Sequence, residues 1–109
     1  MRVMRMGAVI GVRQEKLEEY RRLHAAVWPG VARMISLCHI RNYSIYYRDG
    51  LLFSYFEYTG EDYEADMAKM AADPETQRWW DICKPCQLPL TGRGEGEWWA
   101  AMDEVFHQD

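Results

Sequence analysis

Two residues four positions apart, Tyr20 and His24, are of types that could do acid–base chemistry. Apolar residues between Leu17 and Trp28 recur at three- and four-residue spacings, which predicts an amphipathic helix. On such a helix both side chains project from one face, one turn apart. An imidazole with an ordinary pKa of about 6.5 can take and give protons near neutral pH, and a phenol can hold a substrate hydroxyl. Taken alone, the spacing is more typical of a solvent-facing histidine beside a core tyrosine.

Three further aromatic residues could bind a hydroxylated ligand. Trp79 and Trp80 are adjacent, and on a helix their side chains would point about 100 degrees apart. One of them can therefore enter the core while the other faces elsewhere, where an indole could stack on the C–H face of a sugar; both could also simply pack. Tyr43 lies in a strand-like run where it shares a face with Ile45, although ordinary strand propensity explains a tyrosine there as well.

The motif Cys83-Lys84-Pro85-Cys86 is similar to redox and zinc motifs, but its context favours neither. A redox motif needs its first thiol at the start of a helix, and Cys83 falls near the predicted end of one. A zinc site needs two more ligands; Cys38 and His39 are available, but no spacing requires them. We interpret these cysteines as structural, and we expect no metal and no cofactor.

The hydrophobic pattern along the chain predicts the order β-α-β-β-α-α-β. Asp49-Gly50 between two aromatic, β-branched runs is a strong hairpin signal, and Asp73-Pro74 is typical of a helix start. Pro29 should interrupt or restart the first helix. The expected strands are 3–12, 40–47, 51–58 and 97–107; the expected helices are 15–38 with that interruption, 61–71 and 73–83; residues 85–96 are expected to form a loop.

This element order predicts an α+β fold, with a ferredoxin-like antiparallel sheet and its helices on one face. The helices would leave the other face of the sheet bare. In a chain with 14% aromatic residues we expect that face to be covered by a second copy of the chain, with the final strand crossing over. The prediction is a homodimer.

The overall composition narrows the class of protein. The chain has 109 residues, which suits a single domain over residues 1–109. Its net charge is −4 and its 13 basic residues form no run, which argues against nucleic acid as a partner. No apolar run approaches the roughly 18 residues that a membrane span needs. Three cysteines, an odd number, do not indicate a disulfide framework, so we expect a cytoplasmic protein.

Several segments in series resemble the L-rhamnose mutarotase family. They are Glu19-Tyr20-Arg21-Arg22-Leu23-His24, Val27-Trp28-Pro29, Asn42-Tyr43-Ser44-Ile45-Tyr46, Gln77-Arg78-Trp79-Trp80 and Met102-Asp103-Glu104-Val105-Phe106-His107. The resemblance implies a dimeric α+β barrel that interconverts the α and β pyranose anomers of L-rhamnose, or of a related 6-deoxyhexose such as L-fucose, without a cofactor. It also implies that His24 is the acid–base residue, that Tyr20 and Tyr43 bind substrate hydroxyls, and that Trp79 and Trp80 form the pocket wall.

Two other functions suit the same architecture, because one scaffold hosts many activities. One is a cofactor-light monooxygenase of the dimeric α+β barrel type that accepts a polyphenol or haem in an aromatic pocket. The other is a non-catalytic protein that binds a small molecule. Oxygen consumption would favour the first, and sugar binding without anomer exchange would favour the second.

Overall fold

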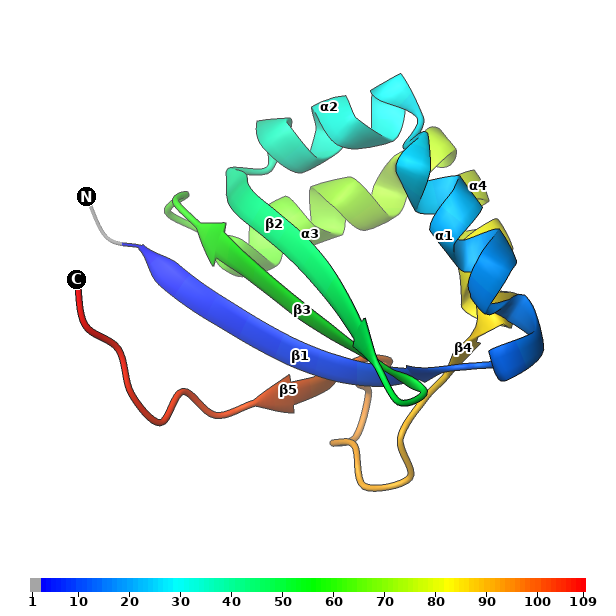
Figure 1. The fold of residues 1–109 in the computed structure, drawn as a ribbon. Coiled ribbons are helices and arrows are strands. Elements are labelled where there is room, and N and C mark those ends of the chain that lie inside the picture. The colour runs from blue at the N-terminus through cyan, green and yellow to red at the C-terminus, as the bar shows by residue number, and fades with distance from the viewer. Residues whose placement is uncertain (1–2) are drawn as a thin grey trace.

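A computed structural model describes residues 3–109 of the chain (Figure 1). In this part of the chain, α-helices lie on one side of a curled antiparallel sheet, which confirms the predicted α+β class. The strands are β1 (Met4–Val12), β2 (Ile40–Arg48), β3 (Leu51–Tyr58), β4 (Gln87–Leu88) and β5 (Ala100–Met102). The helices are α1 (Leu17–Ala25), α2 (Pro29–Leu37), α3 (Tyr63–Ala72) and α4 (Pro74–Cys83), with short 3-10 turns at Gln14–Lys16 and Lys84–Cys86.

The sheet has the order β2-β3-β1, and both β4 and β5 pair with the remaining edge of β1. The hairpin between β2 and β3 turns at Asp49-Gly50, as predicted, with positive φ angles of 51° and 82°. Positive φ at both central residues is the mark of a type I′ turn, whose twist matches that of the flanking strands. A register shift between Arg41 and Ser44 interrupts the pairing of β2 with β3.

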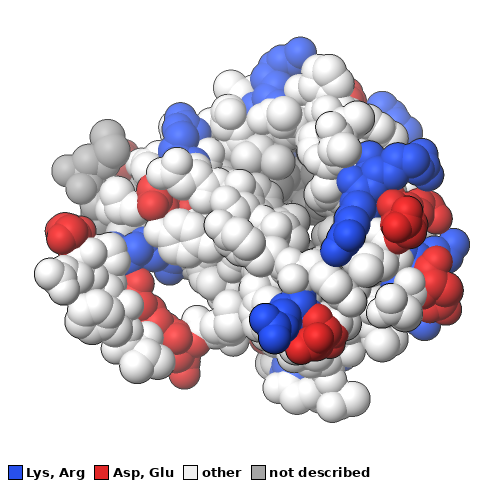
Figure 2. Space-filling view, viewed as in Figure 1, with Lys and Arg blue, Asp and Glu red and all other residues white. Residues whose placement is uncertain are grey.

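Side chains alternate along each strand between the side of the sheet that faces the helices and the opposite, outer side. Ile10 and Leu52 are paired in register, are 0% and 2% exposed, and pack with Val31 and Trp79 of the helices. Because side chains alternate along a strand, those of the neighbouring residues point to the opposite side of the sheet. Figure 1 shows that the helices do not cover this side. On the face shown in Figure 2, charged side chains lie mainly around the rim and the centre is uncharged.

The helix boundaries follow local chemistry. The predicted interruption at Pro29 is confirmed, because α1 ends at Ala25 and α2 begins at Pro29. The predicted start at Asp73-Pro74 is also confirmed: the Asp73 carboxylate accepts from the backbone N–H of Thr76 at 2.9 Å and from its hydroxyl at 2.8 Å. Such capping satisfies backbone donors that have no partner inside the helix.

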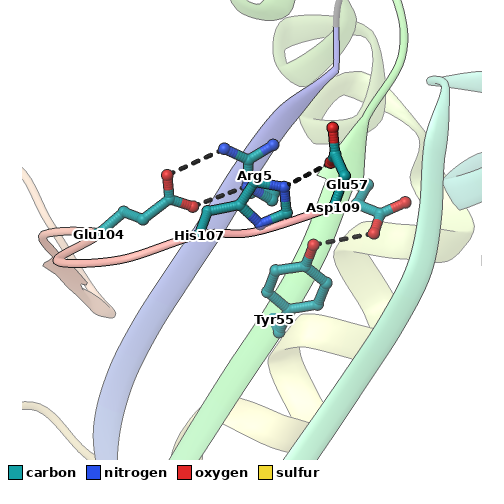
Figure 3. Close-up of polar contacts among 6 residues, drawn as sticks. All are labelled: Arg5, Tyr55, Glu57, Glu104, His107 and Asp109. Atoms are coloured by element: carbon teal, nitrogen blue, oxygen red, sulfur yellow. Dashed lines mark hydrogen bonds and ion pairs between the residues drawn. The ribbon is translucent and has the colours of Figure 1, made fainter.

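The predicted final strand over 97–107 is wrong in its length, since only Ala100–Met102 pair with β1. If the register continued, Arg5 would be paired with Glu104, and these residues instead meet through side chains, at 2.7 and 2.9 Å (Figure 3). β1 continues to Met4, beyond the last residue that pairs with β5, so the pairing ends while the tail still lies beside the sheet, where Phe106 and His107 line a hollow with Arg5 and Tyr55. The predicted loop over 85–96 is also partly wrong, because it begins with a 3-10 turn and the short strand β4.

A buried polar contact ties β3 to α3. The Tyr58 hydroxyl donates to the Asp66 carboxylate at 2.5 Å and accepts from the Asp62 backbone N–H at 3.0 Å. Tyr58 is 1% exposed and Asp66 is 9% exposed, so water has little access to either group. The contact fixes the start of α3 against the end of the sheet.

Replacing Tyr58 by phenylalanine should lower the free energy of unfolding by about 1–3 kcal/mol, because it leaves a buried carboxylate and an N–H without their partner. Urea unfolding followed by circular dichroism measures this. Tyr46→Phe is the matched control, since Tyr46 is 66% exposed and its loss of a hydroxyl should change stability by less than about 0.5 kcal/mol. Equal stabilities for the two variants would contradict the assigned role of the Tyr58 hydroxyl.

Candidate active site

His24 lies on α1 within a cluster of aromatic rings. Its ring stacks on Tyr20 with centroids 4.2 Å apart and an interplanar angle of 24°. Trp79 of α4 meets the same imidazole edge-on, at 5.3 Å and 64°. The histidine is half-buried rather than directed into bulk solvent. The i,i+4 spacing on one helix face therefore brings Tyr20 and His24 together as predicted.

The hydrogen bond of His24 fixes which of its ring nitrogens is free. Nδ1 lies 2.8 Å from the backbone carbonyl oxygen of Tyr20, which can only accept, so Nδ1 carries the proton in the neutral ring. Nε2 then has a bare lone pair. Burial lowers the pKa of His24 below its ordinary value of 6.5, and the bond to the Tyr20 carbonyl offsets this only in part. Neutral His24 is thus the main form at pH 7, and it can accept a proton through Nε2.

Tyr20 is buried, 4% exposed, and its hydroxyl accepts a hydrogen bond from the Gln87 side chain at 3.2 Å. Burial raises the pKa of Tyr20 well above its ordinary value of 10. The phenol therefore stays protonated at any physiological pH, and it can act as a hydrogen-bond donor. Gln87 was not among the predicted site residues, because it falls in a segment that the sequence predicted to be a loop.

The adjacent tryptophans have different surroundings. Trp79 is 6% exposed and contacts both His24 and Trp28, the second at 5.2 Å between centroids and 71° between planes. Trp80 is half-buried, and the ammonium of Lys84 lies 5.6 Å from its ring centroid. One indole is thus in the core and the other is partly accessible, as their helical geometry predicted. Trp28, at the junction of α1 and α2, joins the cluster without having been predicted to do so.

The ring of Tyr43 contacts a residue outside this cluster. It is on β2 at the register shift, it is 43% exposed, and its ring meets Phe56 edge-on at 5.5 Å. The structure therefore brings together Tyr20, His24 and Trp79 in direct ring contact, whereas the ring partner of Tyr43 is a residue of the neighbouring strand.

Two surface hollows lie outside this cluster. One, of about 620 Å³, is formed by the segment 91–98 together with Lys84. The other, of about 280 Å³, lies on the outer side of the sheet between Arg5, Tyr55 and the C-terminal tail. None of the five predicted site residues lines either hollow.

The cysteines are buried and free. Burial raises the pKa of Cys83 to about 12 and also raises the pKa of Cys86, so both thiols stay protonated and unreactive. Within residues 3–109 no three His, Cys, Asp or Glu side chains gather in the manner of a metal site. Nor does any helix of this part of the chain have the length and apolar character of a membrane span.

An imidazole that can accept a proton, a protonated phenol and the indoles of Trp79 and Trp28 lie together on the helical side of the curled sheet. Such a combination suits acid–base catalysis on a small polar ligand. Comparison with known proteins defines the class and the family. The model of a protein family described as L-rhamnose mutarotase matches residues 5–108. The chain belongs to the L-rhamnose mutarotase family, and it is an isomerase of the kind that acts on carbohydrates.

Individual relatives agree with this assignment. L-rhamnose mutarotase of Opitutus terrae is 36% identical over 98% of this chain and 100% of its own. L-rhamnose mutarotase of Bacillus subtilis is 34% identical over 96% and 98%, and that of Phocaeicola vulgatus is 34% identical over 84% and 86%.

Solved structures share the fold. L-rhamnose mutarotase from Formosa agariphila superposes with a TM-score of 0.75 at 17% identity, covering 97% of this chain and 99% of that one. A NIPSNAP family protein from Agrobacterium tumefaciens superposes with a TM-score of 0.60 at 16% identity, covering 83% and 88%. The same fold thus carries more than one family, so the residues of the site have to carry the argument for function.

Proposed function

We propose that the protein interconverts the α and β pyranose anomers of L-rhamnose, with His24 as the principal proton acceptor and donor. The observation that carries the proposal is the arrangement of His24: a half-buried neutral imidazole, with Nδ1 held by a backbone carbonyl and Nε2 free, between a protonated phenol and an indole. The names of the relatives support the choice of sugar.

The reaction needs one proton to leave O1 and one to reach the ring oxygen. His24 Nε2 accepts the proton of the anomeric hydroxyl while the bond from C1 to the ring oxygen breaks and the C1 carbonyl forms. The ring oxygen then receives this proton from the imidazolium, while the Tyr20 hydroxyl, one turn away on the same helix, assists as a hydrogen-bond donor. Rotation about C1–C2 presents the other carbonyl face, and the same transfers in reverse close the ring. Acid–base catalysis of this kind contributes about 10²–10⁴-fold.

The remaining predicted residues would hold the sugar. Trp80, partly accessible, suits stacking on the C–H face of the pyranose, and Trp79 supports His24 from behind. Tyr43, exposed on β2, can offer its hydroxyl to the substrate. These assignments rest on the family motif and on accessibility.

Saturation-transfer NMR between the two anomer signals tests the activity directly. The protein should speed exchange of L-rhamnose above the spontaneous rate and do so more than for L-fucose in a panel of deoxyhexoses. Binding of the sugar with no added exchange would instead indicate a non-catalytic binding protein, and oxygen consumption with an aromatic substrate would indicate a monooxygenase.

We further propose that the protein is a homodimer whose subunits cover the outer side of the sheet. Large apolar residues are exposed there and in the tail: Tyr46 is 66%, Val105 96% and Phe106 78% exposed. Exposed apolar groups of this kind favour a partner surface. Arg5 and Glu104 hold the tail beside β1, so that a second chain could pack on both.

The substitution Phe106→Asp should raise the dissociation constant of the dimer about 10- to 100-fold, because a buried aromatic side chain contributes about 1.5–3 kcal/mol to association. Sedimentation equilibrium at several concentrations measures the effect. Leu37→Asp is the control, since Leu37 is 55% exposed but lies on α2, on the helical side of the molecule. A monomeric native protein at all concentrations, or equal effects of the two variants, would contradict the proposed interface.

A further inference from the structure

A chain of hydrogen bonds links the segment before β5 to the candidate site. The Trp98 indole N–H donates to Oε1 of Gln87 at 2.7 Å, and Nε2 of Gln87 donates to the Tyr20 hydroxyl at 3.2 Å. Gln87 is 6% exposed, so its amide makes these bonds out of reach of bulk water. Three separate elements, α1, β4 and the segment leading into β5, meet at this side chain.

The direction of this chain of bonds is set by its first member. An indole nitrogen can only donate, so the Gln87 atom that faces it must be the carbonyl oxygen. The amide NH₂ then faces Tyr20, and the phenol oxygen must accept from it. The proton of the Tyr20 hydroxyl is consequently directed elsewhere, and within residues 3–109 this hydroxyl has no second hydrogen-bond partner to receive it.

Lys84 holds Trp98 in the position that this arrangement requires. Its ammonium lies 5.5 Å from the Trp98 ring centroid and 5.6 Å from that of Trp80, so that it bridges the two indoles. A cation between two aromatic faces is attracted to both. The segment that carries Trp98 is thereby tied to the same helix, α4, that carries the tryptophans of the site.

We propose that Gln87 is a positioning residue for the anomer exchange: it fixes the Tyr20 hydroxyl as a hydrogen-bond donor to the sugar, and Trp98 fixes the orientation of Gln87. The inference rests on the proposed function, in which Tyr20 faces the substrate. A neutral phenol whose oxygen already accepts one hydrogen bond presents its proton to the ring oxygen of the sugar, the atom that must be protonated when the ring opens.

Replacing Gln87 by glutamate reverses this polarity and provides the test. A carboxylate at position 87 still accepts from Trp98, but it also accepts from the Tyr20 hydroxyl and withdraws that proton from the substrate. At pH 8 we expect kcat/KM for exchange of L-rhamnose to fall about 10- to 100-fold, mostly through kcat. Gln14→Glu, at an exposed glutamine with only a 3.5 Å contact to Tyr47, is the matched control and should leave exchange unchanged.

Acidification should restore part of the loss, because a protonated carboxyl at position 87 can again donate to Tyr20. The ratio of Gln87→Glu to wild-type activity should therefore rise as the pH falls. Burial raises the pKa of the nearby groups Tyr20, Cys83 and Cys86, so these three stay neutral over the range measured. His24, which stacks on Tyr20, takes up a proton in the wild-type protein and in the variant, so its effect is removed by taking the ratio. Lys84, a charged group nearby, contacts Trp98 in both proteins. A purely structural role for Gln87 would give a ratio that does not rise on acidification.

The effect should also depend on the phenol. In a Tyr20→Phe background, Gln87→Glu should cause little further loss, whereas independent effects would multiply. If the glutamate variant does not fold, Trp98→Phe takes its place, since Trp98 is 37% exposed and the substitution keeps an aromatic ring. Loss of the indole N–H lets the Gln87 amide rotate, and we expect exchange to fall about 3- to 10-fold. This loss should again vanish in the Tyr20→Phe background. Full activity of these variants, or losses independent of Tyr20, would overturn the inference, while absence of exchange in the wild-type protein would instead overturn the proposed function.

Discussion

Replacing His24 by asparagine is expected to slow the exchange of L-rhamnose anomers about 10²–10⁴-fold, because the amide cannot take or give the proton in the transition state. Saturation-transfer NMR at equal enzyme concentrations measures the loss. His39→Asn is the matched control: His39 is exposed, and its φ of 65° is a conformation that asparagine tolerates well. Exchange at the wild-type rate in the His24 variant would end the proposed role of the imidazole.

The same role predicts the pH dependence of the native protein. Burial lowers the pKa of His24 below 6.5, and the neutral ring is the proton acceptor, so kcat/KM should be nearly constant at pH values more than about one unit above 6.5. It should fall with protonation of the ring, about tenfold per pH unit once the pH is below the lowered pKa. The kcat/KM of His24→Asn should not show this fall at low pH. If the fall persists in the variant, the group that takes up the proton is not His24.

Much of the fold could be predicted from the sequence because its signals are local. The Asp49-Gly50 turn, the Asp73-Pro74 helix start and the break at Pro29 each depend on a few adjacent residues, and the structure confirms all three. The final strand was predicted too long because its extent depends on a distant partner: pairing with β1 stops at Met102 although β1 continues to Met4, and Glu104 meets Arg5 through its side chain instead.

The same difference between local and distant signals applies to the candidate site. Tyr20 and His24 were predicted to meet because a helix repeat determines their contact. Gln87 and Trp98 could not be predicted as site residues from the sequence. The hydrogen bond from Gln87 to Tyr20 joins residues 67 positions apart, and it forms only because β4 and the segment before β5 pack beside α1. Tyr43 shows the opposite case: its family motif is intact, while the register shift in β2 leaves its ring against Phe56.

The adjacent tryptophans should separate stability from substrate binding. Trp79→Ala is expected to lower the free energy of unfolding by about 3–5 kcal/mol, because a ring that is 6% exposed leaves a cavity between α4, His24 and Trp28. Trp80→Ala removes a half-buried ring and should cost about 1–2 kcal/mol. Urea unfolding followed by far-ultraviolet circular dichroism measures both, since loss of an indole alters the fluorescence signal itself.

In anomer exchange the two variants should change different kinetic constants. Because Trp80 is the accessible indole, its loss should raise KM for L-rhamnose with a smaller change in kcat, as expected when a contact made equally in ground state and transition state is removed. Loss of Trp79 should lower kcat in the folded fraction, because the imidazole of His24 loses the ring that meets its edge at 5.3 Å. Equal destabilisation by the two variants, or a shared rise in KM alone, would mean that burial does not divide the roles of these two side chains. In that case the stacking role would have to pass from Trp80 to another exposed ring, of which Trp98, 37% exposed and held by the same Lys84, is the nearest candidate.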